Sequence, residues 1–181
     1  MLDDPVLVND WHVVGRASGL AENAVTSARL LGVDLVLWRS PKGVHAWHDM
    51  CRHRGAKLSL GTVRDGCLVC SYHGWCYDGS GSCTLIPAHS SLTHKIGAKA
   101  RTFHARVRYG LVWVCLGIPK VDVPSFREWG DPSYKNVHAG PTGSRPAPRV
   151  SLRISWTPGI TLSCTRGRWA DPGTLRCRAT S

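Results

Sequence analysis

Two short pairs of cysteine and histidine constrain this chain more than any other feature. One residue separates Cys51 from His53, two residues separate Cys70 from His73, and sixteen residues lie between the pairs. Each pair is short enough to sit on one tight loop, so two loops could bring two thiols and two imidazoles together. Thiolates and imidazoles are both metal ligands. The four residues are therefore predicted to hold a metal centre.

The number of ligands alone does not distinguish a zinc ion from an iron–sulfur cluster. A structural zinc site takes two Cys and two His tetrahedrally, typically with two cysteines in one pair and two histidines in the other. Here each pair mixes one Cys with one His. Such mixing suits a Rieske cluster, a [2Fe-2S] centre in which two Cys hold one iron and two His hold the other. Each loop would then give one ligand to each iron.

The residues around the four ligands extend the match. They read CRHRG at 51–55, LSxG at 58–61, CSYHGW at 70–75, YDxxG at 77–81 and IPA at 86–88. These motifs resemble the Rieske domain in the alpha subunit of aromatic ring-hydroxylating and related Rieske non-haem iron oxygenases, and the resemblance runs from about Trp11 to Gly117. The respiratory-complex type of Rieske domain has an extra Cys in each cluster loop. In that type the two extra cysteines form a disulfide. Here Arg54-Gly55 and Gly74-Trp75 occupy the corresponding places, so this chain cannot form such a disulfide.

The resemblance implies a cofactor, its ligands and a partner. Cys51 and Cys70 would hold the inner iron of a [2Fe-2S] cluster as thiolates, and neutral His53 and His73 would hold the outer iron near solvent. The cluster would take an electron from a reductase or ferredoxin. In the family it passes the electron to a mononuclear Fe(II) held by two His and a carboxylate in a catalytic domain. Family members are homo-oligomers or hetero-oligomers.

Other side chains are assigned by position. Arg54, Tyr72 and Trp75 adjoin the ligands and are candidates for supporting them or for docking a partner. The remaining cysteines of the region lie in strand-like runs and are predicted to be core or half-buried thiols: Cys67, Cys76, Cys83 and Cys115. Four histidines are expected to be surface residues rather than ligands: His45, His48, His89 and His104.

Short apolar runs between turn residues predict an all-β fold of Rieske-type antiparallel sheets with two cluster-binding loops. The expected strands cover 11–14, 24–31, 33–38, 44–47, 66–69, 75–77, 81–85, 101–109 and 111–116. The run at 33–38 is almost continuously apolar, which indicates burial on both faces. Leu58, Leu60 and Val63 are expected to fill the space beneath the loops, where Gly55 and Gly74 let the chain turn sharply.

Composition and charge divide the chain. Residues 1–10 are expected to be a leader without signal-peptide features, 11–118 a Rieske domain, 119–140 a linker toward a missing catalytic domain, and 141–181 an irregular tail. The chain carries a net charge of +11, and the tail contributes seven Arg and one Asp to it. Basic clusters with interleaved aromatics do not precede the tail, so no nucleic-acid partner is expected. We also expect no membrane span and, because iron-bound thiolates need a reducing compartment, a cytoplasmic location.

The tail itself suggests a shift of reading frame near Gly140. The related oxygenases open their catalytic domain here with a motif like ENFxDxxHxxxxH, and the chain as written lacks it and its iron ligands. A shifted reading frame joins the last base of each codon to the first two bases of the next codon. With a suitable choice of synonymous codons, the tail in this frame can encode ENFVD, then a His, and then a second His five residues later. At Trp156-Thr157 no base is free, and that junction gives the codon for the motif's Asp. The chain as written would move electrons but hydroxylate nothing.

Two rival functions remain open at this point. One is a free-standing Rieske ferredoxin, although such carriers usually stop soon after the last strand. The other is a zinc-bound interaction module with a basic, nucleic-acid-binding tail. Iron and sulfide content separates the zinc module from the other two.

Overall fold

Antiparallel strands make up most of the computed structural model, which describes residues 4–138, 152–155, 161–163 and 178–180. The chain divides into two units, Met1–Val123 and Pro124–Ser181. In the first unit, a six-stranded sheet has the order β1-β10-β9-β4-β3-β2 and a four-stranded sheet the order β5-β6-β7-β8. The all-β prediction is confirmed.

Nine of the ten strands in these two sheets match expected strands, and β5 was not expected. The six-stranded sheet contains β1 (His12–Arg16), β2 (Val25–Leu30), β3 (Val33–Ser40), β4 (Gly43–His48), β9 (Thr102–Arg108) and β10 (Leu111–Cys115). The four-stranded sheet contains β5 (Thr62–Arg64), β6 (Cys67–Val69), β7 (Cys76–Tyr77) and β8 (Cys83–Leu85). Six short helical segments were not expected: α1 (Pro5–Val8), α2 (Thr93–Ile96), η1 (Ala17–Gly19), η2 (Leu58–Leu60), η3 (Pro87–Leu92) and η4 (Arg127–Gly130).

The second unit contains η4 and two strand pairs, in which β11 (Lys135–His138) pairs with β12 (Leu152–Ser155) and β13 (Thr161–Ser163) with β14 (Arg178–Thr180). The tail predicted over 141–181 is described only at these last three strands, and the rest of it lies outside the described residues. In the described part of the chain, no helix is long and apolar enough to cross a membrane.

Three hairpins of the first unit share one kind of turn. Leu31-Gly32, Asp65-Gly66 and Tyr109-Gly110 each join two strands, and both residues of each turn have positive φ, between 49° and 82°. A two-residue turn of this hand matches the right-handed twist of the flanking strands. Glycine at the second position lowers the cost of the left-handed conformation.

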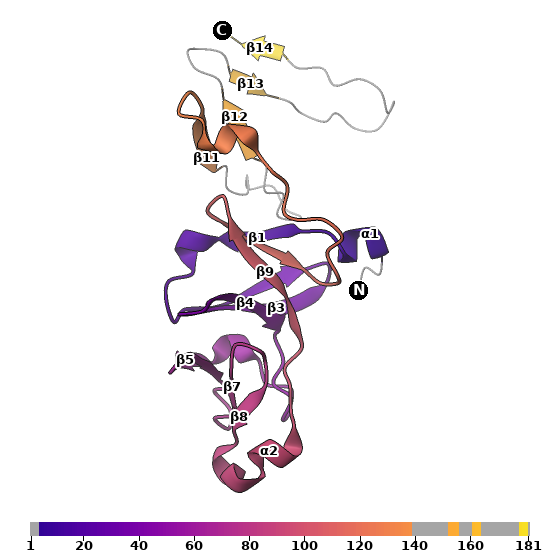
Figure 1. Ribbon diagram of the computed structural model, residues 1–181, viewed down its shortest axis with the longest axis vertical. Coiled ribbons are helices and arrows are strands. Elements are labelled where there is room, and N and C mark those ends of the chain that lie inside the picture. Colours follow the sequence, from indigo (N-terminus) through magenta and orange to yellow (C-terminus); the bar gives the residue numbers. More distant parts are fainter. Residues whose placement is uncertain (1–3, 139–151, 156–160, 164–177, 181) are drawn as a thin grey trace. The chain divides into compact units, whose positions relative to one another are not determined.

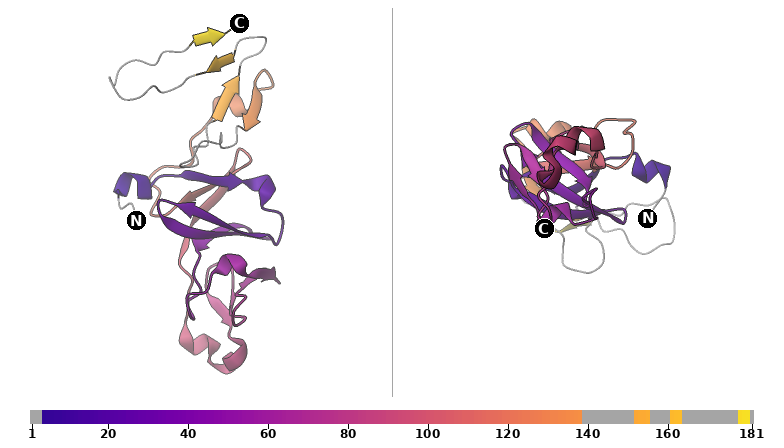
Figure 2. Two further views of the ribbon diagram at one scale, coloured as in Figure 1. Left: turned by 180° about the vertical axis from the view of Figure 1, so that it is seen from behind. Right: turned by 90° about the horizontal axis from the view of Figure 1, so that it is seen from below.

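Strand β3, which lies between β4 and β2, separates two hydrophobic cores, as its continuous apolar character predicted. Leu35 and Leu37 pack into a core within the six-stranded sheet. Val36 and Trp38 point to the other face, into a core that also contains Leu68 and residues of both Cys/His loops. Figure 1, and Figure 2 from behind, show β3 and β4 between β1 and the strands of the smaller sheet. Side-chain alternation along β3 thus joins the cluster-binding part to the larger sheet.

Some side chains lie elsewhere than expected. Leu58 is fully buried, as predicted, but Leu60 is 70% exposed and does not fill the space beneath the loops. In β9, the alternation of Phe103, Ala105 and Val107 with polar residues predicts that Val107 lies on the inner face, but Val107 is 48% exposed. His104 is exposed as predicted, whereas His45 is half-buried and stacks on Trp38 with ring centroids 4.2 Å apart.

Candidate metal centre

The two Cys/His loops have the same backbone design. In the first, Cys51 N–H donates to Ala56 O (2.8 Å) and Gly55 N–H donates to Cys51 O (2.9 Å). In the second, Cys70 N–H donates to Trp75 O (2.9 Å) and Gly74 N–H donates to Cys70 O (3.0 Å). Each loop therefore closes on its own cysteine.

Glycine occupies the same position in both loops, four residues after the cysteine. Gly55 has φ +70° and Gly74 has φ +69°, a left-handed conformation that costs other residues about 1–3 kcal/mol. A Cβ on Gly74 would also lie 3.2 Å from Pro87 Cγ. The glycines explain why loops with different Cys-to-His spacing follow one path.

The two thiols are buried together at the base of the loops. Cys51 is 2% exposed and Cys70 is 3% exposed, and both belong to the same hydrophobic core. Burial raises the pKa of the Cys70 thiol, while the backbone N–H groups of Tyr72 and His73 act in the opposite direction. These N–H groups are oriented to stabilise negative charge on the sulfur.

The two imidazoles lie at the exposed end of the loops. His53 Nδ1 and His73 Nδ1 are 3.1 Å apart, and both side chains are exposed. Two nitrogen ligands on one tetrahedral metal ion are about 3.4 Å apart when each bond is about 2.1 Å. Desolvation lowers the pKa of His53, and the neighbouring His73 and Arg54 lower it further. The same nitrogen of each ring therefore faces a common point.

Aromatic rings flank both imidazoles. Trp75 is buried and stacks on His53, with ring centroids 4.7 Å apart and planes 8° from parallel. Tyr72 is 62% exposed, and its ring centroid lies 3.9 Å from that of His73. Both residues were candidates because they adjoin the ligands in the sequence. In the structure, Trp75 contacts His53 from the interior, whereas Tyr72 contacts His73 at the surface.

Tyr77 contacts the site although the sequence did not single it out as a site residue. Its hydroxyl lies 3.2 Å from Cys51 Sγ and accepts a hydrogen bond from Arg52 N–H at 3.3 Å. Tyr77 is fully buried, and burial raises the pKa of its hydroxyl strongly, as does the Cys51 side chain. The hydroxyl therefore stays protonated and can donate to the sulfur. Its position in β7, opposite Leu68, could have been found only from the strand pairing.

A carboxylate closes the first loop from below. Asp49 is 6% exposed, and its two oxygens accept hydrogen bonds from Ser59 N–H (2.7 Å) and from the Ser59 hydroxyl (2.6 Å). These bonds tie the end of β4 to η2 across the segment that carries Cys51 and His53. Little in the sequence indicated this role, because an Asp two residues before Cys51 could serve many functions.

The geometry fits a centre that takes two ligands at each of two points. In the described part of the chain, no three His, Cys, Asp or Glu side chains gather as the ligands of one metal ion. The four predicted ligands instead form a buried sulfur pair and an exposed nitrogen pair. A dinuclear cluster with different ligands on its two irons needs this arrangement, whereas a tetrahedral zinc ion needs all four ligands around one point.

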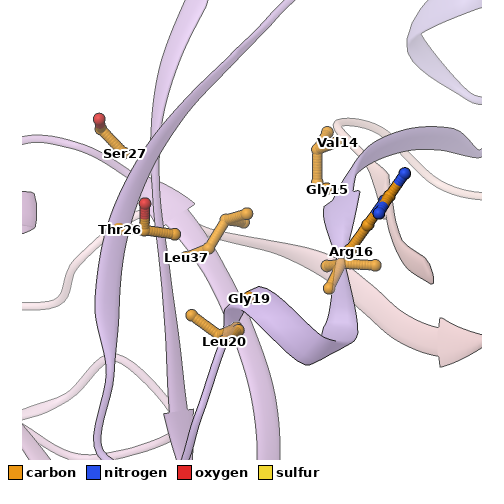
Figure 3. A pocket seen from close by; sticks show the side chains of 9 residues that line it. Val14, Gly15, Arg16, Gly19, Leu20, Thr26, Ser27 and Leu37 are labelled. Atoms are coloured by element: carbon orange, nitrogen blue, oxygen red, sulfur yellow. The ribbon is translucent and has the colours of Figure 1, made fainter. Parts of the chain in front are cut away.

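The other cysteines are not among the four predicted ligands, although Cys83 packs against the core that contains Cys51 and Cys70. Cys67, Cys76 and Cys83 are half-buried and Cys115 is buried, as predicted, and all six cysteines in the described residues are free thiols. A cavity of about 210 Å³ lies near Arg16, Leu20 and Leu37 in the six-stranded sheet, and none of the four predicted ligands lines it. Figure 3 shows the side chains around this cavity.

The fold and the site together define a small β-protein in which two loops bring together two buried cysteines and two exposed histidines. Residues 10–104 match the family model of the Rieske [2Fe-2S] domain, which is more than half of the chain. The chain belongs to the Rieske [2Fe-2S] domain family.

Similar proteins include an oxidoreductase and two methylxanthine demethylases. The chain is 40% identical over 114 residues to oxidoreductase NdmD of Pseudomonas putida, covering 62% of this chain and 19% of that protein. It is 38% identical over 136 residues to methylxanthine N1-demethylase NdmA of Pseudomonas putida, covering 70% of this chain and 38% of that protein. The solved structure of NdmB from Pseudomonas putida CBB5 superposes with a TM-score of 0.69 at 33% identity, covering 76% of this chain and 44% of that one. The chain thus spans less than half the length of these relatives.

Proposed function

We propose that Cys51, His53, Cys70 and His73 hold a [2Fe-2S] cluster, with the thiolates on the inner iron and the imidazoles on the outer one. The observation that carries this proposal is the separation of the ligands into a buried sulfur pair and an exposed nitrogen pair with Nδ1 atoms 3.1 Å apart. Such a cluster supplies a one-electron acceptor and donor with a potential of about −150 to +300 mV, against about −400 mV for plant-type ferredoxins.

The residues of this chain would control access to the centre. Trp75 and Tyr77 exclude water from the sulfur side, because both are buried against the cysteines. His53 and His73 leave the nitrogen side open to solvent, so electrons from a reductase or ferredoxin would enter there. The free thiols fit a reducing compartment such as the cytoplasm.

We also propose that the intact counterpart of this chain is a terminal oxygenase component. NdmA and NdmB, which are demethylases by name, are more than twice as long as the region they share with this chain, which covers 38% and 42% of them. Their extra length agrees with the oxygenase motif that a shifted reading frame recovers after Gly140, whose two His would belong to a mononuclear Fe(II) site. A free-standing electron carrier is the alternative.

Two experiments test these proposals separately. Replacing His73 by Cys should lower the reduction potential toward that of a four-thiolate cluster at about −400 mV. An unchanged potential would show that His73 is not a ligand of the cluster. Resequencing the gene across the codons for Val137–Val150 decides the second point. A frame that continues into ENFVD supports the oxygenase, whereas the frame as written would leave an electron carrier.

A further inference from the structure

The part of the chain that carries the imidazoles is basic, while the part that precedes it is acidic. Residues 51–99 contain six Lys or Arg and two Asp, a net charge of +4, whereas residues 1–50 contain four Lys or Arg and six Asp or Glu, a net charge of −2. No acidic residue lies between Asp78 and Asp122. Asp78 is already engaged, because its carboxylate accepts hydrogen bonds from Ser80 and Ser82 in its own turn.

Two of these cations, Arg52 and Arg54, flank His53 in the chain. We call the surface formed by Arg52, His53, Arg54, Tyr72 and His73 the imidazole face, and all five residues are exposed. The ion pairs found in the described residues do not involve either arginine. Tyrosine and arginine are, with tryptophan, enriched among the interface residues that contribute most of the binding energy.

We propose that the imidazole face docks an acidic electron-transfer protein, one with carboxylates around its own redox centre. This inference rests on the proposed function and adds the charge of the partner and the residues that receive it. In the reaction, one electron leaves the reduced partner and one enters the oxidised Rieske centre, and no bond or proton changes hands. Opposite charges around two centres steer the encounter and accelerate association at low salt.

The test measures the rate at which a reduced plant-type ferredoxin, as an acidic probe, reduces the full holo chain in stopped flow. The second-order rate constant should fall steeply as ionic strength rises, because salt screens charges on exposed surfaces. The R52Q/R54Q double variant should react about tenfold more slowly at low salt and lose most of its salt dependence. Tyr72→Ser should slow the reaction further, whereas Tyr72→Phe should not.

Matched controls separate docking from changes in the cluster. The R29Q/K120Q double variant removes the same charge from exposed residues of the larger sheet and the segment after it, and it should react like the wild type. Reduced methyl viologen, a small cation, should reduce R52Q/R54Q at least as fast as the wild type. A variant that reacts slowly with both reductants has a changed cluster or potential rather than a changed docking surface.

Each outcome decides the proposal. A wild-type rate constant that does not change, or rises, with ionic strength overturns it, and so does an equal loss in R52Q/R54Q and R29Q/K120Q. Iron and sulfide content, measured on the same samples, reports the proposed function independently. A chain that binds no cluster refutes both, and a chain with an intact cluster but salt-independent reduction refutes only the docking surface.

Discussion

The hydroxyl of Tyr77 is expected to set part of the reduction potential. It lies 3.2 Å from Cys51 Sγ in a site where both residues are almost fully buried. A hydrogen bond to the sulfur stabilises the reduced centre more than the oxidised one, because reduction adds one negative charge. Tyr77→Phe removes this bond and leaves the ring packing in place, so it should lower the potential.

The size of the shift follows from the strength of the bond. A hydrogen bond to a charged group contributes about 1.5–3 kcal/mol, and only the part that differs between the redox states moves the potential. A difference of about 1–2 kcal/mol corresponds to about 40–90 mV for one electron. We therefore expect Tyr77→Phe to lower the midpoint potential by this amount.

The assay is a spectroelectrochemical titration of the reconstituted chain, with iron content checked for each variant. Tyr72→Phe is the matched control, because it removes a hydroxyl from an exposed ring on the imidazole face and should leave the potential unchanged. A potential for Tyr77→Phe within about 10 mV of the wild type, with the cluster intact, would refute the reasoning.

Three further predictions concern stability. Ser59→Ala leaves the buried Asp49 carboxylate with one partner fewer, so it should lower the free energy of unfolding by about 1–3 kcal/mol, as urea denaturation would show; an unchanged midpoint would contradict it. Gly74→Ala places a Cβ near Pro87 at φ +69° and should cost about 1–3 kcal/mol and reduce bound iron, while Gly19→Ala, where a Cβ meets nothing within 4 Å, should do neither. Burial lowers the pKa of His45 below its ordinary value of 6.5, because it disfavours the charged imidazolium. The contribution of neutral His45 to the free energy of unfolding is therefore complete above pH 6.5 and is lost as pH falls below that value. Urea midpoints across this range should fall less in His45→Gln than in the wild type, and parallel curves would count against this role.

The sequence predicted the strands and hairpins well because their signals are local. The apolar run of β3 and the Gly32 and Gly110 turns depend on residues adjacent in sequence. Leu60 and Val107 were misplaced for the opposite reason. Their exposure depends on how η2 and β9 pack against distant strands, and a strand-like or apolar pattern does not contain that information.

The candidate ligands were also local, but their surroundings were not. Their spacing in the sequence was enough to propose Cys51, His53, Cys70 and His73. In the structure the two cysteines, one from each loop, are buried, and the two histidines are exposed. Tyr77 was missed because its contact with Cys51 crosses twenty-six positions of the chain. His45 was expected at the surface, since nothing in its neighbours shows that it packs on Trp38 and beneath the Gly79 turn.

The most direct test of the account is the metal and sulfide content of the purified chain after anaerobic reconstitution, together with its reduction potential. We expect two iron atoms and two acid-labile sulfides per chain, and a potential within about −150 to +300 mV. One zinc ion per chain without sulfide, or a potential near about −400 mV, would contradict the assignment of two cysteines and two histidines to a Rieske centre.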